Sequence, residues 1–293
     1  MSNESTIKEP QSEGRGEPPG GRQRRKLDQQ GSTGISAVYP IARGNLPETE
    51  LTQGDYVVRF ARSPQELEQI LRLRFEVFNL ELGEGLDESY LSGRDEDPFD
   101  AVCHHAVVLS RQEQRPVGTI RLQTSEMARN NLGFYSETEF DLRPLPEEIL
   151  HNSMEIGRAC VLRSHRNKRV LFLLWKALAL YLSFNRQRRL FGCCSLNSQD
   201  PQVGHLALRY FRREGHIHPS FQVKPKEGFE CPPCEDVEPV EQLEIPTLFR
   251  TYLRYNAKVC SGPAVDAAFK TIDFFVLLDI ADLNREKYRL FFQ

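Results

Sequence analysis

The strand-like run 153–162 carries a glutamate and an arginine three residues apart, Glu155 and Arg158, within otherwise apolar sequence. A carboxylate on a buried strand costs free energy unless it is paired or takes part in chemistry. A cationic turn follows at the start of an apolar helix, with Arg163, Arg166, Lys168 and Arg169. Helix N-termini favour anions. A base followed by an anion site is what acyl transfer from a phosphopantetheine thioester needs.

An amine can attack a thioester only after it loses a proton, and the tetrahedral oxyanion must be stabilised. Glu155 is therefore the candidate base, acting directly or through one water, and Arg158 is the second candidate catalytic residue. Side chains alternate along a regular strand, so Arg158 would lie on the opposite face from Glu155 unless a bulge beside Gly157 changes the phase. The alternative is a structural ion pair on an edge strand.

Two carboxylates and two guanidiniums form a second candidate set, namely Arg74, Asp97, Asp100 and Arg121. Brought together, they could hold an amino acid. A carboxylate would bind its amine or side-chain ammonium, and an arginine would bind its α-carboxylate in a bidentate manner. The alternative is a salt-bridge network that orders the acidic segment 81–98.

Hydrophobic periodicity predicts the strands and helices that carry these residues. Strands are predicted at 56–61, 104–110, 117–123, 153–162, 190–196 and 273–278. Helices are predicted from Ser63 onward, over 167–185 and 203–213, and from Pro246 to Tyr255. Ser63 is the expected N-cap of the first helix, with Pro64 in its first turn and Glu66 completing a capping box. This order predicts a mixed α/β sheet with helices on both faces.

Composition divides the chain of 293 residues into a tail and one domain. Residues 1–50 are rich in Gly, Pro and charge, which predicts a disordered basic tail. Residues 51–293 are predicted to form the folded domain, with an insertion at about 219–246 that shows no periodicity. The net charge of −3 gives no support for nucleic-acid binding.

Seven cysteines without disulfide-framework spacing favour reduced thiols in a cytoplasmic protein. Cys231 and Cys234 resemble half of a zinc site, but four ligands are normally required, so no metal is predicted. The apolar run 170–184 is shorter than the roughly 20 residues of a spanning helix and favours a core helix. Peripheral contact with the inner face of the cytoplasmic membrane stays open.

Five segments in order match a known pattern. They are 72–78, 95–100 with 104–108, 117–122, 155–158 with Val161 and 166–167, and 252–260 with 271–273. On these segments the chain resembles the GNAT-superfamily branch of ornithine–acyl carrier protein N-acyltransferases and long-chain N-acyl amino acid synthases. More distantly, it resembles acyl-homoserine-lactone synthases. The glycines that acetyl-CoA enzymes carry after this strand are missing from 166–171, as in the acyl-carrier branch.

The resemblance implies a GNAT-like fold with a mixed, mostly antiparallel sheet flanked by helices. It implies transfer of a long-chain acyl group, 3-hydroxylated in one variant, from acyl carrier protein to the α-amine of ornithine or another amino acid. No cofactor would stay bound, and the donor substrate is an acyl-phosphopantetheine thioester on carrier protein or coenzyme A. Backbone N–H groups of 156–159 would bind the thioester oxygen. Donor binding falls on Val161, Arg163, Arg166, Lys168 and Arg169.

Two other functions remain open at this level. One is acyl-homoserine-lactone synthesis from S-adenosylmethionine, against which the ornithine-enzyme-like segments 252–260 and 271–273 argue. The other is a catalytically idle module that binds carrier protein or a membrane surface, against which Glu155 argues.

Overall fold

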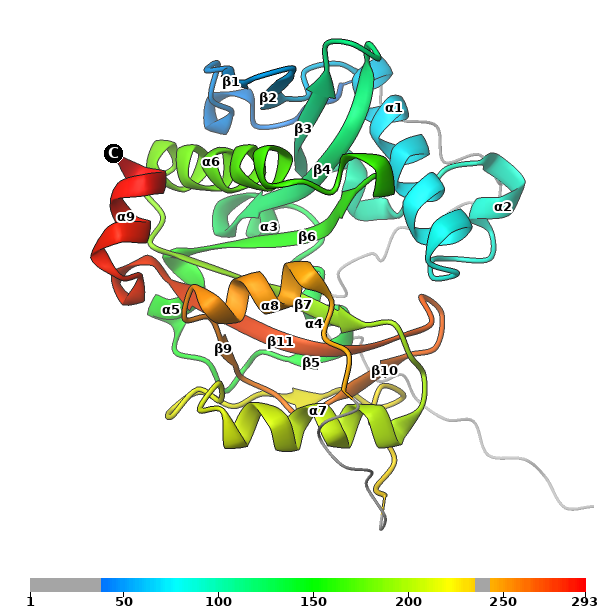
Figure 1. Cartoon of the computed structure of the whole chain (residues 1–293). Coiled ribbons are helices and arrows are strands. Elements are labelled where there is room, and N and C mark those ends of the chain that lie inside the picture. The colour runs from blue at the N-terminus through cyan, green and yellow to red at the C-terminus, as the bar shows by residue number, and fades with distance from the viewer. Residues whose placement is uncertain (1–37, 235–242) are drawn as a thin grey trace, which may run out of the picture. The chain divides into compact units, whose positions relative to one another are not determined.

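The computed structural model describes residues 38–234 and 243–293. One nine-stranded sheet organises this part of the chain (Figure 1). Its order is β1 (Leu51–Gln53), β2 (Tyr56–Phe60), β3 (His104–Ser110), β4 (Arg115–Thr124), β6 (Ser153–Val161), β7 (Arg189–Leu196), β11 (Thr271–Asp279) and β10 (Ala264–Asp266), with β9 (Lys258–Val259) also paired to β11. The β6–β7 ladder is parallel and the other ladders of this sheet are antiparallel. The predicted mixed, mostly antiparallel sheet is confirmed.

Helices cover both faces of the sheet, as predicted. The larger core contains side chains from α6 (Lys168–Phe184), α7 (Pro201–Arg213), α8 (Thr247–Arg254) and α9 (Arg285–Phe292). The opposite face carries α1 (Pro64–Phe75), α3 (Ser125–Asn130), α4 (Ser136–Glu139) and α5 (Glu147–His151). A short helix, α2 (Ser89–Ser92), interrupts the acidic segment, and β5 (Phe140–Asp141) pairs with β8 (Lys224–Pro225).

Local capping explains where the main helices begin. The Ser63 hydroxyl accepts the Glu66 backbone N–H, as predicted, whereas the Glu66 carboxylate bonds the N–H of Arg62 and so does not complete the capping box. The Asn167 side chain accepts from the backbone N–H groups of Arg169 and Val170 and starts α6. The Asn167 cap fixes the start of α6 just after the short 3-10 turn Arg163–His165 that follows β6.

The strands β6 and β7 separate in the middle of the sheet. They pair only from Ser153 to Glu155, opposite Arg189 to Phe191, although both strands continue beyond these residues. Gly192 lies at the point of separation. A Cβ there would stand 2.1 Å from the carbonyl oxygen of Ile156, so the strands approach too closely for any side chain. We call this point the fork, defined by Glu155, Ile156, Phe191 and Gly192.

A bulge changes the phase of β6 just after the fork. Its register with β4 shifts between the pair Gly157–Arg121 and the pair Cys160–Thr119. Arg158 sits in the bulge with φ of 47°, in the left-handed region. The bulge beside Gly157, named above as the condition for a change of phase, is therefore present.

The folded part begins earlier than the predicted boundary at residue 51. Tyr39 and Leu46 are buried, and the Tyr39 hydroxyl bonds His105 Nδ1 at 2.9 Å. Residues 38–50 therefore belong to the domain, because apolar side chains among them pack on its sheet and helices. Residues 1–37 of the predicted tail and 235–242 of the predicted insertion lie outside the described residues.

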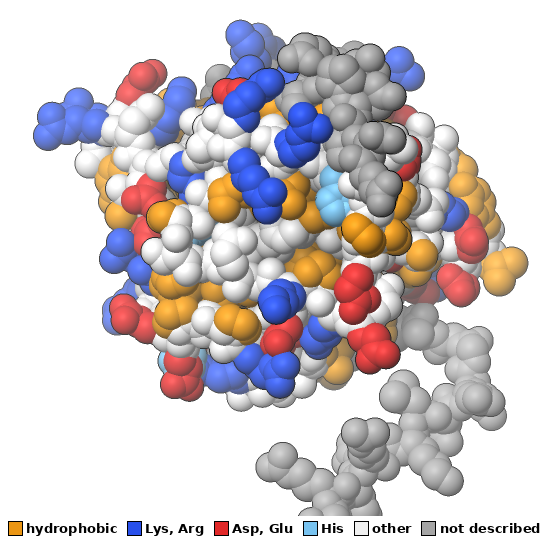
Figure 2. All heavy atoms as spheres, turned by 90° about the horizontal axis from the view of Figure 1, so that it is seen from below, with side chains coloured by type: hydrophobic (Ala, Val, Ile, Leu, Met, Phe, Trp, Pro, Cys, Tyr) orange, Lys and Arg blue, Asp and Glu red, His pale blue; other side chains and the backbone are white. Residues whose placement is uncertain are grey.

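The face seen from below Figure 1 mixes basic, acidic and apolar side chains (Figure 2). Neither basic nor acidic side chains dominate this view. Among residues 38–234 and 243–293, no helix combines the length and the hydropathy that crossing a bilayer requires.

Candidate active site

A cavity of about 830 Å³ opens at the fork. Its lining includes Gly157 of β6 and Gly192 of β7, and it draws side chains from both faces of the sheet. On the face of α4 its lining is polar, with Glu84, Gln123, Tyr135, Glu139, Glu155, Cys193, Asp266 and Asp273. On the face of α6 and α8 the lining is mainly apolar. The cavity therefore has a polar part and an apolar part, with the fork among its lining residues.

Glu155 lies at the fork with its carboxylate fixed by two backbone groups. Its Oε1 accepts from the Ser136 N–H at 2.6 Å, and its Oε2 accepts from the Tyr135 N–H at 2.7 Å. Burial raises the pKa of this carboxyl, while the hydrogen bonds from Ser136 and Tyr135 oppose the rise. The carboxylate holds the start of α4 in place and also lines the cavity. It can therefore stabilise the fold and contact a bound substrate.

Arg158 lines the same cavity as Glu155 because of the bulge. Its guanidinium lies 4.9 Å from the centre of the Tyr135 ring and 4.2 Å from that of Phe269. It pairs with Asp97 at 3.2 Å and with Asp95 at 3.5 Å. The predicted base and the arginine three residues later therefore line one cavity but form no ion pair with each other.

The second predicted set is also brought together, but mostly behind the cavity wall. Arg74 is completely buried and pairs with Asp95 at 2.6 Å and Asp100 at 2.5 Å. Arg121 pairs with Asp97 at 2.7 Å and Asp100 at 3.1 Å. Burial opposes ionisation of Asp100, yet Arg74 and Arg121 outweigh it, so the pKa of this carboxyl is well below its usual value. Of Arg74, Asp97, Asp100 and Arg121, only Arg121 lines the cavity.

The cationic turn contributes one rim of the cavity. Val161, Arg166 and Lys168 line it, whereas Arg163 and Arg169 do not. Arg166 and Lys168 are exposed, and Arg166 pairs with Glu81 at 2.6 Å. Two backbone N–H groups at the start of α6 already bond the Asn167 side chain, which leaves the side chains of the rim as the main groups for an anion.

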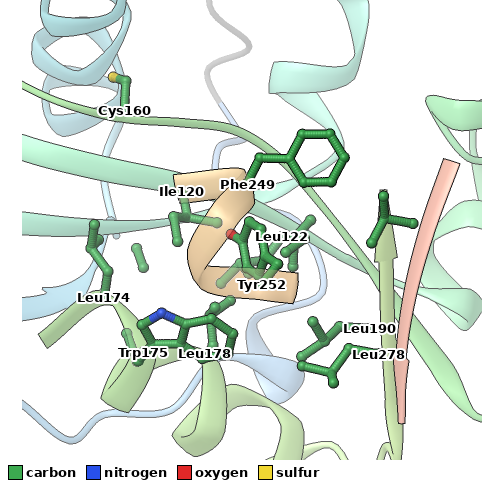
Figure 3. Close-up of a cluster of buried hydrophobic side chains, with 14 of the residues drawn as sticks. Ile120, Leu122, Cys160, Leu174, Trp175, Leu178, Leu190, Phe249, Tyr252 and Leu278 are labelled. Carbon is green, nitrogen blue, oxygen red and sulfur yellow. The ribbon is translucent and has the colours of Figure 1, made fainter. Parts of the chain in front are cut away.

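The apolar part of the cavity is built from four elements (Figure 3). Phe249 and Tyr252 come from α8, Leu174 from α6, Leu190 from β7 and Leu278 from β11. All five are buried. The Tyr252 hydroxyl has no hydrogen-bond partner among the described residues. This chamber offers an apolar surface suited to a hydrocarbon chain.

Four acids that line the polar part were not proposed as site residues from the sequence: Glu84, Glu139, Asp266 and Asp273. Burial and the charge of Asp273 raise the pKa of Glu84 to about 7, and burial raises that of Asp273 to about 6. Asp273 interrupts an apolar strand just as Glu155 does, so the same criterion could have found it. Glu139 lies in an irregular segment that gave no such signal.

Within the described residues, the Cys231 and Cys234 thiols belong to no group with metal-ligand spacing. Cys231 is half-buried, and its Sγ lies 3.8 Å from the carbonyl oxygen of Pro201. Among the described residues, the one group of three side chains with metal-ligand geometry is Glu139, Asp266 and Asp273.

Comparison with known proteins agrees with this architecture. A family described as "Acetyltransferase (GNAT) domain" matches residues 73–176, which run from α1 into α6. The L-ornithine N(alpha)-acyltransferase of Agrobacterium fabrum is 34% identical over 248 residues, covering 78% of this chain and 83% of that protein. The enzyme of the same name from Rhizobium meliloti is 32% identical, covering 77% and 80%.

Among solved structures, the AHL synthase LasI matches with a TM-score of 0.44 and 12% identity, covering 81% of this chain and 94% of that one. The sequence relatives, each matched over more than three quarters of its length, decide the family. The chain belongs to the L-ornithine N(alpha)-acyltransferase family and is an amine N-acyltransferase.

Proposed function

We propose that the chain transfers a long-chain acyl group from acyl carrier protein to the α-amine of ornithine. The cavity at the fork carries this proposal, because it joins a buried carboxylate, a cationic rim and an apolar chamber. The ornithine relatives support the acceptor. In this assignment the acceptor binds on the face of α4 and the acyl chain on the face of α6 and α8.

Glu155 is the proposed base. Its buried carboxylate takes a proton from the acceptor ammonium, directly or through one water, and the free amine then attacks the thioester carbonyl. Two backbone N–H groups and the Ser136 hydroxyl bond this carboxylate, which has about four acceptor positions, so one position is left for this step. The raised pKa makes Glu155 a stronger base than a solvated carboxylate.

The oxyanion would form where β6 and β7 separate. The β6–β7 ladder ends at Glu155, so backbone groups of the following residues that face β7 are outside that ladder. Donors placed where negative charge develops are a large source of rate acceleration. We assign the oxyanion to the N–H groups of residues 156–159 and place Arg158 and Arg121 as the guanidiniums that face the acceptor's carboxylate.

The donor's phosphopantetheine arm would enter past Arg166 and Lys168. Its phosphate needs cationic partners, and an acidic carrier surface would dock on the same exposed charges. The chamber of Phe249, Tyr252 and Leu278 would receive the acyl chain. The thiolate is the leaving group and takes up the second proton that the nitrogen loses as the amide forms, and Glu155 releases the first proton to solvent.

Mass spectrometry of lipids tests the proposal. Cells that express the chain should accumulate an N-acyl ornithine whose acyl length matches their carrier-bound pool. Cells with the Glu155→Gln variant should not. An acyl-homoserine lactone, or no new amide in cells that contain the folded chain, would contradict the proposal.

A further inference from the structure

We propose that three buried acids, Glu139, Asp266 and Asp273, form the subsite for the side-chain ammonium of the acceptor. We call them the acid triad. The inference rests on the proposed function and extends it, since it restricts the acceptor to amino acids that carry a second, cationic amine.

The acid triad comes from three elements that converge on the cavity. Glu139 ends α4, and Asp266 and Asp273 lie on the neighbouring antiparallel strands β10 and β11. Each offers one carboxylate oxygen, and these three oxygens lie within 4.8 Å of one another. All three side chains are buried, and all three line the cavity that also holds Glu155.

The carboxylate oxygens of the acid triad have few hydrogen-bond donors from the protein, which leaves acceptors for a ligand. Asp266 Oδ1 accepts from the Phe269 N–H at 2.9 Å, and Asp273 Oδ2 accepts from the Thr271 hydroxyl at 3.2 Å. Among the described residues, no backbone N–H and no cation reaches Glu139, whose carboxyl is bonded only by the Cys193 thiol and by the Asp273 carboxyl. The Ser195 hydroxyl also bonds the Asp273 carboxyl. A primary ammonium has three N–H donors and can bond several of these carboxylate oxygens at once.

The electrostatics of the acid triad also call for a cation. Within residues 38–234 and 243–293, no lysine or arginine pairs with a carboxylate of the acid triad, and the nearby Arg158 and Arg121 pair with Asp95 and Asp97 instead. Burial and the charges of Asp273 and Asp266 raise the pKa of Glu139 well above its usual value. Burying like charges together without a counter-charge is costly, and such clusters are concentrated at functional sites.

The position of the acid triad relative to Glu155 suits a diamino acid. Glu155 holds the backbone N–H of Ser136, and Glu139 follows three residues later in the same short helix. Glu139 and Glu155 both line the cavity. One end of the acceptor can therefore present its α-amine to Glu155 while the other places its ammonium at Glu139.

A divalent metal is the competing occupant, since the acid triad supplies only oxygen ligands. Calcium takes six to eight oxygens, and magnesium needs near-octahedral geometry. Three carboxylates, two of them already engaged by Phe269 and Thr271, fit an ammonium better. The experiment therefore includes a chelator.

Acceptor kinetics with ornithine and norvaline test the inference, because norvaline keeps the carbon skeleton and lacks the side-chain ammonium. Wild-type kcat/KM should be higher for ornithine by at least about 100-fold, since a site built to bind a polar group rejects an analogue without it. Glu139→Gln should lower kcat/KM for ornithine by about 10-fold or more, mainly through KM, and leave norvaline unchanged. Glu137→Gln is the matched control, on the same helix but outside the cavity lining.

Calorimetric binding of both amino acids without donor separates the inference from the proposed function. If the wild type acylates neither amino acid, the proposed function fails, and binding of ornithine that is lost in Glu139→Gln still supports the subsite. Equal use or equal binding of norvaline and ornithine overturns the subsite while leaving N-acylation intact. Activity that EDTA abolishes and Mg²⁺ restores also overturns it.

Discussion

At the scale of single residues, Glu155 shows how one side chain can support both the fold and the chemistry. Its carboxylate satisfies two backbone N–H groups at the start of α4, and its burial raises its pKa. An apolar strand that carries a carboxylate predicted this residue from the sequence. The two contacts to Tyr135 and Ser136 could not be predicted, since they join segments about 20 positions apart.

We expect Glu155→Gln to lower turnover by on the order of 10²-fold or more, the usual scale for loss of a general base. Gln keeps one acceptor oxygen, so one bond to α4 survives and the other is lost. The free energy of unfolding should fall by about 1–2 kcal/mol. Steady-state kinetics and urea unfolding would measure the two effects. Near-normal turnover in a folded Gln variant would remove Glu155 as the base.

The acid triad makes a second prediction, on stability against pH. In the folded chain the pKa of Glu139 lies above its value in the unfolded chain, so the folded state binds more protons. Stability therefore falls as pH rises from the unfolded pKa toward the folded one. Burial and the charges of Asp273 and Asp266 raise the pKa of Glu139, and the hydrogen bond with the Cys193 thiol opposes the rise.

We expect Glu139→Gln to raise the free energy of unfolding at pH 8 by on the order of 1 kcal/mol and to change it little at pH 4.5. Urea unfolding of both chains without acceptor at the two pH values is the measurement. A loss of stability at pH 8 would show that the Glu139 charge is compensated by groups of the protein, which would argue against an ammonium subsite.

At the scale of elements, the fork between β6 and β7 decides where chemistry can occur. The six main strands could be predicted from periodicity, but the end of the β6–β7 ladder could not, because register depends on contacts across the sheet. The sequence named a bulge beside Gly157 only as the case in which Arg158 would share a face with Glu155, and could not predict that the bulge forms. It brings Arg158 to the cavity that Glu155 lines.

We expect Gly192→Ala to damage the fork. The added Cβ would lie 2.1 Å from the Ile156 carbonyl oxygen, so β6 and β7 must move apart. Overpacking of this kind costs about 1–3 kcal/mol of stability, and turnover should fall with it. Gly157→Ala is the control for stability, since nothing lies within 4 Å of a Cβ there. Equal stability of the two variants would contradict the close approach of the strands.

The cationic rim makes a prediction for the donor. Reversing Arg166 and Lys168 to Glu should raise KM for acyl carrier protein far more than it lowers kcat, and added salt should weaken the wild-type association. The same reversal at exposed Arg212 and Lys224, which do not line the cavity, is the control. An unchanged KM in the Arg166 and Lys168 variant would remove this rim as the docking site.

At the scale of the whole molecule, the site depends on segments that are distant in sequence. Glu139, Glu155 and Asp273 come from three separate parts of the chain and line one cavity. Motif order could predict the family and the base. It could not predict the acid triad or the buried positions of Arg74 and Asp100, because their partners are set by tertiary packing. Relatives of 34% and 32% identity confirm the family and leave the acceptor to experiment.

The most direct test of the account is acyl transfer by the purified chain to ornithine labelled with ¹⁵N at the α-amine. With long-chain acyl carrier protein as donor, we expect an amide whose tandem mass spectrum places the acyl group on the labelled nitrogen, with one free carrier thiol per amide formed. Acylation of the unlabelled side-chain nitrogen, or thiol release without an amide, would contradict the proposed orientation of the acceptor at Glu155.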